Sequence, residues 1–378
     1  MTDLLDIVGQ GAALAQLLRT LGGPRRPHAY LFAGPEGVGR RTTAEALARR
    51  LLCERPLERP NAGALPELPE DFPLTLACGQ CPSCRAFEAG THADYHLVSK
   101  ELARYSDNAA VRGRVMQELS IDVVREFLIA PAGQCGALGR GKVFIVREAE
   151  LMSEAAQNAL LKTLEEPPPG VTIILLCPSP RELLPTTRSR CSLIRFGPLP
   201  RDFVAGRLTA GGMDAQEARF WAGYTAGSLG LSQRLSSAGL YPVKRELVDR
   251  LAGLYQAVDP ELGDWLLAQV EGLTDARLSA DPELARTLAT RQSAGTLLAM
   301  IAGVYRDAMA LAGGWEELIH ADQAEALAAI ARALGLDLSA EVVTQLVRYE
   351  QLLWSNVNPK IVWDNVVITC ATGAPLDV

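Results

Sequence analysis

The stretch that decides the fold is Gly34-Pro35-Glu36-Gly37-Val38-Gly39-Arg40-Arg41-Thr42. Its spacing fits the phosphate-binding pattern G-x-x-x-x-G-K-[ST], in which glycine amides and a helix N-terminus cradle phosphates. In that pattern the lysine neutralises phosphate and the next hydroxyl holds magnesium, but here Arg40 and Arg41 occupy those positions. Arginine spreads its charge over a bulky planar fork and offers no oxygen to a metal. The loop therefore predicts a nucleotide-binding fold that no longer turns over nucleotide.

The segments on either side of this loop have the patterns that such a fold requires. The apolar run at 28–33 suits a buried strand, and residues 42–52 alternate alanine and leucine with arginine as a helix does. Thr42 could act as a shifted magnesium ligand, although one position along a helix turns a side chain by roughly 100°. The alternative is that residues 34–39 form only a glycine-rich turn, but strand, loop and helix come in the required order.

A second element of a nucleotide site departs from its pattern in the same way. Residues 142–146 predict a buried strand, after which a P-loop ATPase would place an aspartate that holds magnesium. Arg147 stands there instead and is followed by Glu148. A cation at this place would repel Mg²⁺ and could pair with Glu36, Glu148 or Glu150. The two lost metal contacts together predict that ATP and magnesium are not bound or not hydrolysed.

Length and composition limit the classes of protein that fit. A chain of 378 residues that is 48% hydrophobic is long enough for two or three domains with real cores. No apolar run approaches roughly 20 residues and the start lacks the features of a signal peptide, so we expect a cytoplasmic protein without a membrane span. The net charge of −7 excludes a basic field over the whole molecule, although arginines are concentrated in residues 19–55. Any contact with DNA is expected to be local or shared with partners.

The eight cysteines of a cytoplasmic chain favour a metal site over disulfides. Cys78, Cys81 and Cys84 follow the spacing C-x2-C-x2-C, and Cys53 at the end of the predicted helix is the candidate for a fourth ligand. Four thiolates make a closed, tetrahedral zinc site, which is structural because no position stays open for substrate. Free surface cysteines and an iron–sulfur cluster are the alternatives, because thiolates alone do not identify the metal.

The segment between Cys53 and Cys78 contains five prolines and few large apolar residues. Residues 54–77 are therefore predicted to form an extended, solvated surface insert, with a proline-rich ligand for a partner domain as the alternative. Downstream of the insert, His92 and His96 are further candidate metal ligands. Four cysteines would already complete the metal shell without them.

Strand and helix patterns alternate through the rest of the first half. Strands are expected at 95–98, 143–146, 171–176 and 192–196, and helices at 121–130 and 153–166. Ser153 is a suitable N-cap for the second helix, and the run of prolines at 167–169 stops it. With the strand at 28–33, this alternation predicts a five-stranded parallel α/β sheet that helices cover on both faces.

Two motifs in this half resemble a known family. One is a predicted helix and the prolines that end it, Asn158-Ala159-Leu160-Leu161-Lys162-Thr163-Leu164-Glu165-Glu166-Pro167-Pro168. The other is Ser189-Arg190-Cys191, which follows the next strand. Both are similar to the clamp-loader branch of the AAA+ proteins. The cysteine insert after the first helix narrows the resemblance to the bacterial DNA polymerase III clamp loader, in which tau/gamma and delta-prime subunits share it. The degenerate loop and Arg147 resemble the delta-prime type. The resemblance covers residues 5–235 and weakens beyond them.

The resemblance implies a role in a protein assembly. Tau/gamma subunits of the family bind ATP, whereas a delta-prime subunit completes the ring. By its position in the motif, Arg190 would be an arginine finger that reaches a neighbour's ATP and stabilises charge on the transferring phosphoryl group. Arg188 is the runner-up, and an Arg190 that only braces its own domain is the alternative. The implied partners are tau/gamma and delta subunits in a hetero-pentameric ring, with the sliding clamp and primed DNA reached through the complex.

The resemblance also implies a domain layout. Residues 1–197 would form an AAA+ P-loop domain with a zinc module at about 53–92, residues 198–238 a small helical lid, and residues 239–378 an all-α collar that oligomerises. Two more nucleotide contacts depart from the family: Gly230 replaces a sensing arginine in the lid, and Cys177 replaces a polar sensor. Most tryptophans of the collar are expected to fill its core, namely Trp265, Trp315, Trp354 and Trp363.

The sequence thus predicts a non-catalytic clamp-loader subunit with structural zinc, and two other function classes remain. A tau/gamma-like motor would use Thr42 and Glu148 with an arginine loop, and the isolated chain would bind ATP tightly. A stand-alone zinc protein that binds nucleic acid through the arginines near residues 40–55 would bind DNA in a strongly salt-dependent way. The acidic net charge does not favour this last class.

Overall fold

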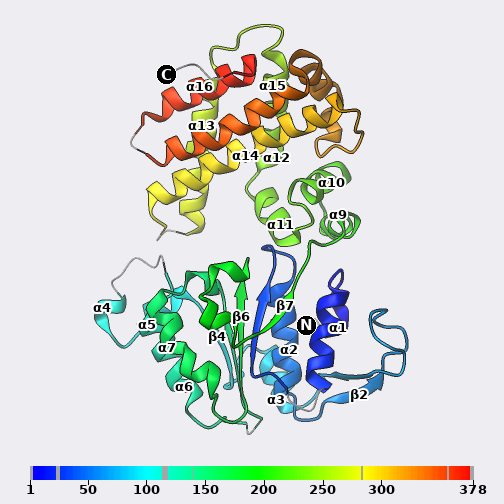
Figure 1. Cartoon of the computed structure of the whole chain (residues 1–378), viewed down its shortest axis with the longest axis vertical. Helices are drawn as coiled ribbons and strands as arrows, with labels where there is room; N and C mark the ends of the chain where they lie inside the picture. The colour runs from blue at the N-terminus through cyan, green and yellow to red at the C-terminus, as the bar shows by residue number, and fades with distance from the viewer. Residues whose placement is uncertain are drawn as a thin grey trace. The chain divides into compact units, whose positions relative to one another are not determined.

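The chain divides into two compact units, Met1–Pro200 and Arg201–Val378 (Figure 1). The computed structural model describes residues 3–22, 26–112, 118–138, 140–281, 284–355 and 357–374. Each unit buries its own set of apolar side chains, so each is described by itself.

The first unit is built on a sheet of five parallel strands in the order β4-β5-β6-β1-β7. The strands are β1 (Ala29–Ala33), β4 (Tyr95–Val98), β5 (Lys142–Val146), β6 (Val171–Cys177) and β7 (Ser192–Arg195). β1, β5 and β6 are buried along their whole length, as is usual for parallel strands with both faces covered. The predicted five-stranded parallel sheet is confirmed.

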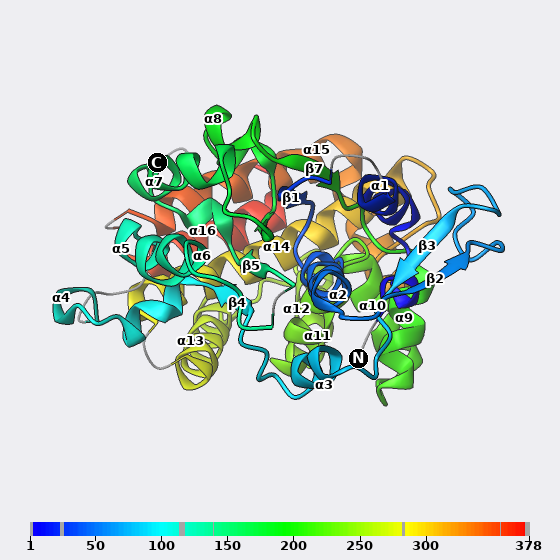
Figure 2. The same ribbon diagram turned by 90° about the horizontal axis from the view of Figure 1, so that it is seen from below.

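Helices cover both faces of this sheet (Figure 2). One face carries α5 (Ile121–Val124), α6 (Ala130–Ala132) and α7 (Glu154–Glu165), and the other carries α1 (Gly11–Gly22) and α2 (Arg40–Leu52). Alternate strand residues face α7, so that Leu31, Phe144 and Ile173 share a core with Leu160. This follows from the two-residue period of a strand, which sends neighbouring side chains to opposite faces.

The helices begin and end close to the predicted residues, with one irregular segment. The predicted helix at 121–130 is not a single α-helix, because α5 passes through a turn of π-helix at Arg125–Ile129 before α6. Ser153 caps α7 as predicted, since its hydroxyl oxygen accepts a hydrogen bond from the Ala156 N–H at 3.2 Å. α2 begins two residues earlier than predicted, so both substituted loop positions lie in its first turn.

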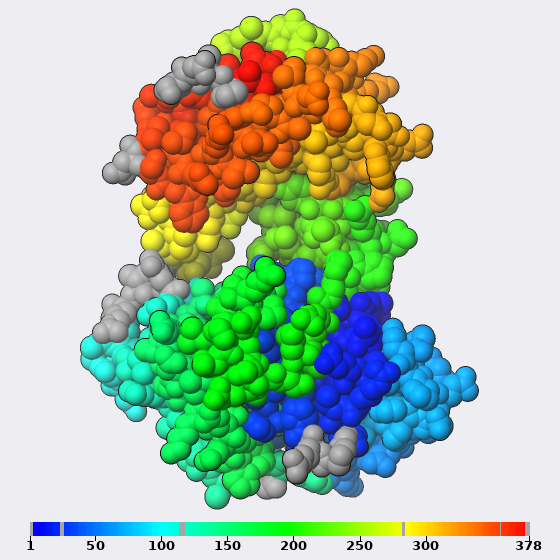
Figure 3. Space-filling model, viewed as in Figure 1, coloured from blue at the N-terminus to red at the C-terminus, as the bar shows by residue number. Residues whose placement is uncertain are grey.

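The insert at 54–77 is not the solvated loop that its prolines predicted. β2 (Leu57–Pro60) and β3 (Pro73–Leu76) pair as an antiparallel hairpin at the edge of the first unit (Figure 3, light blue). Asn61 orders the connecting loop, since its side chain is buried and its oxygen accepts a hydrogen bond from the Leu65 N–H at 2.8 Å. Its nitrogen donates to three backbone carbonyls, those of Leu65, Leu68 and Pro69. One buried amide thus replaces the water contacts that the loop would otherwise make.

The second unit consists of helices. They are α9 (Arg201–Ala210), α10 (Ala215–Tyr224), α11 (Leu229–Ser237), α12 (Leu240–Gly253), α13 (Leu262–Ala280), α14 (Arg286–Ala312), α15 (Ala324–Leu353) and α16 (Pro359–Thr372). α14 packs along α15, which is kinked at Gly335. Of the described helices, α14 alone has the length and apolar composition to cross a membrane, and half of its most apolar window is buried in the protein.

The tryptophans of the second unit do not all fill its core. Trp363 is buried, and Trp265 is half-buried beneath the guanidinium group of Arg250. Trp315 and Trp354 are instead 71% and 52% exposed. The expectation that most of these side chains pack inside was therefore wrong for two of the four, because helical periodicity does not reveal which aromatic side chains meet solvent.

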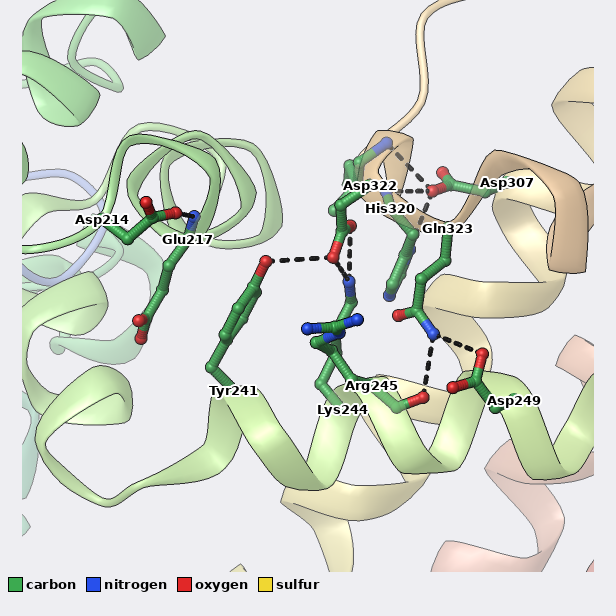
Figure 4. A network of polar contacts seen from close by, with 11 residues as sticks. Asp214, Glu217, Tyr241, Lys244, Arg245, Asp249, Asp307, His320, Asp322 and Gln323 are labelled. Carbon is green, nitrogen blue, oxygen red and sulfur yellow. Dashed lines mark hydrogen bonds and ion pairs between the residues drawn. The ribbon is translucent and has the colours of Figure 1, made fainter.

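A buried polar network connects α12 with the turn of 3₁₀-helix that precedes α15 (Figure 4). The Lys244 ammonium donates to both carboxylate oxygens of Asp322 at 2.5 Å, and the Tyr241 hydroxyl donates to the same carboxylate at 3.0 Å. The ammonium also lies 4.5 Å from the ring centroid of Phe220 on α10. The network therefore joins three segments that are far apart in the sequence.

Candidate functional site

The loop between β1 and α2 keeps the backbone geometry of a phosphate-binding loop. Gly37 and Gly39 have φ angles of 73° and 101°, which side chains with a Cβ rarely adopt. At Gly34 an added Cβ would lie 2.3 Å from the carbonyl oxygen of Phe196, so the loop begins in close contact with the end of β7. The glycines of the pattern are thus needed for the backbone whether or not a nucleotide binds.

Gln10 connects this loop to the last residues of the first unit. Its side chain is 4% exposed, and its nitrogen donates to the carbonyls of Val38 at 3.0 Å and Gly197 at 2.8 Å. Its oxygen accepts a hydrogen bond from the Gly197 N–H at 3.1 Å. A lone glutamine belongs to no spacing pattern, so the sequence alone does not single it out.

Arg40, at the position of the missing lysine, lies among acidic groups. Burial, the largest cause, lowers the pKa of its half-buried guanidinium group. Four groups oppose that shift, in the order Glu150, Cys177, Glu36 and Glu182. Burial in turn raises the pKa of the Glu150 carboxyl, while Arg40 lowers it. Carboxylates therefore interact with this cation at the place where the pattern would put phosphates.

The next two loop residues face solvent. Arg41 is half-exposed, and its Nε donates to Glu45 at 2.7 Å, one turn further along α2. Thr42 is exposed. The hydroxyl that contacts the loop is that of Thr43, which donates to the Gly39 carbonyl at 2.9 Å. Of the substituted positions, the structure brings Arg40 into the acidic surroundings and leaves Arg41 in a surface ion pair.

Arg147 and Glu148 follow β5 directly. The Arg147 N–H donates to the Val98 carbonyl at 2.9 Å, and Glu148 has a left-handed backbone with φ of 47°. Burial would raise the pKa of Glu101, but Ser99, the residue's own N–H and the charge of Arg147 lower it overall. The charge of Arg147 thus lowers the pKa of Glu101, whereas the charge of Arg40 lowers that of Glu150.

Arg190 lies after α8 (Pro185–Arg188) and bonds to its own domain. Its Nε donates to the Glu165 carboxylate at 2.7 Å, and the same carboxylate forms an ion pair with its terminal nitrogen. A third bond runs to the Thr186 carbonyl at 2.8 Å. The two charged side chains remain 31% and 48% exposed. The motif arginine is therefore oriented by the end of α7 and by α8, while part of its surface meets solvent.

Cys53, Cys78, Cys81 and Cys84 gather into one cluster, with all four sulfur atoms within 4.8 Å of one another. The Cys53 and Cys81 sulfurs are 3.9 Å apart. Ligands at the usual Zn–S distance of about 2.3 Å in a tetrahedron lie roughly 3.8 Å apart, so the spacing fits zinc. Cys53, which follows α2 as its C-cap, joins the other three as predicted. The cluster can hold a metal ion.

Backbone N–H groups point at these sulfurs, as they do around bound metal. Cys78, Cys81 and Cys84 each donate a backbone hydrogen bond to the sulfur of another cysteine, at 3.3, 3.3 and 3.4 Å. The Gln80 N–H does most to lower the pKa of Cys78, which falls to about 6. Burial raises the pKa of Cys84 to about 12. Backbone N–H groups thus favour the thiolate form in the cluster, whereas burial opposes it.

The two histidines downstream of the cysteines are not part of the cluster. The Asp94 N–H donates to His92 Nδ1 at 3.1 Å, so His92 Nε2 carries the proton that faces Ser83 Oγ at 2.9 Å. The Ser83 hydroxyl donates to the Leu52 carbonyl at 2.7 Å. His96 stacks on Phe144 instead. His92 therefore supports the metal module from outside, by connecting α3 (Pro82–Glu88) with α2 and β4.

Gly230, which the resemblance would place in a lid, lies at the start of α11. Ser228 caps that helix by accepting from the Leu231 N–H at 3.1 Å, and Gly230 lies in its first turn. Cys177 ends β6, and burial raises the pKa of its thiol to about 12. Neither residue supplies a charge to a nucleotide.

Comparison with known proteins identifies the family to which the chain is similar. Residues 9–200 match the family model described as DNA polymerase III, delta subunit. The chain is 32% identical over 283 residues to DNA polymerase III subunit delta' of Pseudomonas aeruginosa, which covers 70% of this chain and 76% of that protein. The delta' subunit of Escherichia coli is 32% identical over 242 residues, or 64% of this chain and 62% of that protein.

Similarity over a shorter part of the chain extends to the tau subunit. The tau subunit of Escherichia coli is 36% identical over 186 residues, which is 49% of this chain and 24% of tau. A solved DNA polymerase III gamma subunit-related protein of Thermotoga maritima aligns with 96% of this chain at 16% identity and a TM-score of 0.37. The family model spans half of the chain and the delta' match spans more than two thirds of it. The chain therefore belongs to the delta' family of DNA polymerase III subunits.

Proposed function

We propose that this chain is a clamp-loader subunit that does not hydrolyse ATP and that supports the ATP site of a neighbouring subunit with Arg190. Its partners would be tau/gamma and delta subunits in a hetero-pentameric ring in the cytoplasm. The ring would place the sliding clamp on primed DNA. Residues 1–197 would form the P-loop-type domain, residues 198–238 the lid, and residues 239–378 the collar that joins the ring.

The observation that carries the proposal is the environment of Arg40. Carboxylates of Glu36, Glu150 and Glu182 interact with Arg40, the cation at the lysine position of the phosphate-binding pattern. These carboxylates would repel the phosphates of ATP, and the neighbouring Arg41 provides no magnesium ligand. The isolated chain would then bind ATP weakly and without turnover.

The second support is the way in which Arg190 is held. An ion pair as exposed as that between Arg190 and Glu165 contributes little to stability, about 1 kcal/mol or less. The guanidinium group could therefore exchange this carboxylate for a phosphate oxygen at low cost. Its bond to the Thr186 carbonyl would keep it oriented meanwhile. Glu165 would act as the positioning residue of the finger.

We also propose that the four-cysteine cluster holds zinc. Four thiolates leave no open coordination position, so the ion would be structural and would contribute folding free energy. It would fix the end of α2 against α3. Cys53 directly follows the helix of the phosphate-type loop, so the metal would stabilise the scaffold on which that loop is built.

The first test is equilibrium binding of Mg-ATP to the purified chain, with turnover followed in the same samples. We expect no binding, or binding without hydrolysis. The variant Arg40→Lys/Arg41→Thr restores the residues of the pattern and serves as a comparison for any residual binding. Steady turnover by the unaltered chain would refute the non-catalytic role and favour a motor.

The second test concerns Arg190 in the assembled complex. Arg190→Ala is expected to lower ATP hydrolysis by the complex, because a finger arginine is worth about 10³–10⁵ in kcat at one site. Arg188→Ala, two residues away, is the matched control and should retain activity. Assembly measured by gel filtration must be the same for both variants. Equal ATPase activity in the two complexes would refute the role of Arg190.

A further inference from the structure

A metal site made of four thiolates carries a charge that its surroundings must balance. Four thiolates and one divalent ion sum to a net charge of about −2. Cys53, Cys81 and Cys84 are each at most 1% exposed, so water does not screen this charge well. The backbone N–H groups around the sulfurs offer partial charges only. A full balance needs cationic side chains nearby.

Two arginines lie beside the cluster on the helix that ends at its first cysteine. Arg49 and Arg50 occupy the last turn of α2, four and three residues before Cys53. Residues at these spacings share a helix face, which places both side chains on the side of Cys53. Arg49 Nη2 lies 3.2 Å from the position that a Cβ would take at Gly79, inside the loop between Cys78 and Cys81.

Each of the two arginines has a buried donor that is not satisfied among the described residues. The Nε atoms of Arg49 and Arg50 are buried and have no hydrogen-bond partner within the described part of the chain. Burial, the largest cause, lowers the pKa of Arg50, and the Cys53 thiol does most to raise it again. The charges of Arg26 and Arg140 add repulsion, and Glu58 offsets part of it. Cys53 is thus the largest favourable charge that acts on Arg50.

We propose that Arg49 and Arg50 are the counter-cations of the metal–thiolate centre, and that metal binding and the last turn of α2 stabilise each other through them. The proposal rests on the proposed zinc site. In the metal-free chain both arginines are partly buried, and Arg50 is repelled by Arg26 and Arg140. Once the four cysteines bind the ion as thiolates, the same groups face a dianion. The arginines are positioning residues that favour the thiolate state of the cluster.

Phosphates of a nucleic acid are the other anions that such arginines commonly contact. The burial of both Nε atoms favours the thiolates, because phosphate contacts need guanidinium groups that are open to solvent. The position of Arg49 over Gly79 points in the same direction, since Gly79 lies between two metal-binding cysteines. The experiment below separates the two kinds of anion.

The test measures binding of Zn²⁺ and Co²⁺ alone to the full chain. Competition with a chromophoric chelator gives the affinity, and the sulfur-to-cobalt charge-transfer band reports on the thiolates. Arg49→Gln and Arg50→Gln should each weaken Zn²⁺ binding about tenfold, and the double variant about a hundredfold, the range known for groups that support metal ligands. Arg50→Lys keeps the charge and should recover most of the affinity.

Arg85→Gln is the matched control, because Arg85 adjoins Cys84 in the sequence but is exposed. It should change the Zn²⁺ affinity by no more than about twofold, since exposed charges are screened. Thermal unfolding with and without metal adds a readout that separates charge from packing. Loss of both arginines should destabilise the metal-bound chain and leave the metal-free chain at least as stable as before.

Each other outcome overturns a defined part of the argument. Equal affinities of Arg50→Gln and Arg85→Gln, or equal losses of stability with and without metal, would refute the counter-cation role and leave only packing. Unchanged metal binding together with loss of salt-dependent binding to a DNA oligonucleotide would assign the arginines to phosphates. Failure of the unaltered chain to bind either metal would refute the zinc site itself, and the counter-cations with it.

Discussion

Replacing Lys244 with Met should destabilise the second unit far more than any surface ion pair could. The side chains of Lys244 and Asp322 are only 1% and 5% exposed, so the substitution leaves a buried carboxylate with the Tyr241 hydroxyl as its remaining partner. Breaking a buried pair on one side costs about 3–5 kcal/mol. The loss of the contact between the ammonium and the Phe220 ring adds to that cost.

The assay uses the distribution of tryptophan along the chain. All five tryptophans lie between residues 221 and 363, in the second unit. Tryptophan emission during urea unfolding therefore follows this unit alone, which avoids treating two units as one transition. Lys360→Met is the matched control, because Lys360 pairs with Asp264 while both side chains are more than half exposed. We expect it to cost far less than Lys244→Met, because solvent screens an exposed pair.

A double-substitution cycle identifies the source of the loss. If the stranded charge of Asp322 causes it, Lys244→Met/Asp322→Leu should be more stable than the sum of the single variants by about 2 kcal/mol. A Lys244→Met variant no less stable than Lys360→Met would refute the reasoning. Additive losses in the cycle would show that packing, and not the buried charge, determines the cost.

Three further predictions concern other parts of the chain. Burial, the largest cause, lowers the pKa of His320 despite its bond to Asp307, so the unfolded chain takes up a proton at higher pH than the folded chain. The free energy of unfolding, followed by tryptophan emission, should therefore fall below pH 6.5 by up to about 1.4 kcal/mol per pH unit. The same slope in His320→Asn would contradict this. Asn61→Ala should remove amide-exchange protection from residues 61–72, since buried carbonyls lose their donor at about 1–3 kcal/mol each, and retained protection would refute the ordering role of Asn61. Gly34→Ala should lower the free energy of unfolding, followed by circular dichroism, by about 1–3 kcal/mol, because the added Cβ would clash with the Phe196 carbonyl. Gly197→Ala is the control, since its Cβ would have open space and should leave stability unchanged. Equal effects of the two variants would contradict the close contact at Gly34.

The central strands were predictable because β1, β5 and β6 are largely apolar runs bounded by glycine, proline or charged residues. β1 and β6 begin and end within one residue of the predicted bounds, as expected for strands that are buried on both faces. β7 does so as well, although it is only partly buried. The π-type turn at Arg125–Ile129 was not predictable, because the side-chain pattern does not distinguish hydrogen bonds to the fourth residue from bonds to the fifth.

The hairpin at 57–76 was missed for a different reason. Its prolines at both strand ends suggested a loop, and the order of the connecting segment depends on hydrogen bonds from one side chain, Asn61. An asparagine between prolines carries no local signal that its amide will be buried. Those bonds order the segment only in the folded arrangement, in which leucines of the loop exclude water.

The candidate sites were predictable where spacing alone sets the chemistry. Four cysteines at the observed spacing converge, including Cys53 across the long insert. The acidic groups around Arg40 come from three separate loops, which follow β1, β5 and β6. Because the carboxyl ends of parallel strands meet at one edge of a sheet, that convergence could have been inferred from the strand order once it was known. The position of Arg49 and Arg50 beside the cysteines could not have been inferred in this way, since arginines on a helix usually belong to a solvated face.

The charges of α2 explain why the loop at its start is unsuited to phosphate. A helix N-terminus favours anions and a C-terminus favours cations, each by about 0.3–1 kcal/mol. Arg40 and Arg41 therefore oppose the helix dipole, and nearby carboxylates offset them: Glu45 pairs with Arg41, while Glu36, Glu150 and Glu182 interact with Arg40. Arg49 and Arg50 at the other end agree with the dipole. The arginines at the start of the helix thus already interact with carboxylates, whereas those at its end, on our proposal, balance the metal–thiolate centre. Lysine at position 40 would keep a cation beside Glu36, Glu150 and Glu182, and threonine at position 41 would remove only the surface partner of Glu45. Because the three carboxylates remain, we expect the restored loop to recover little ATP binding.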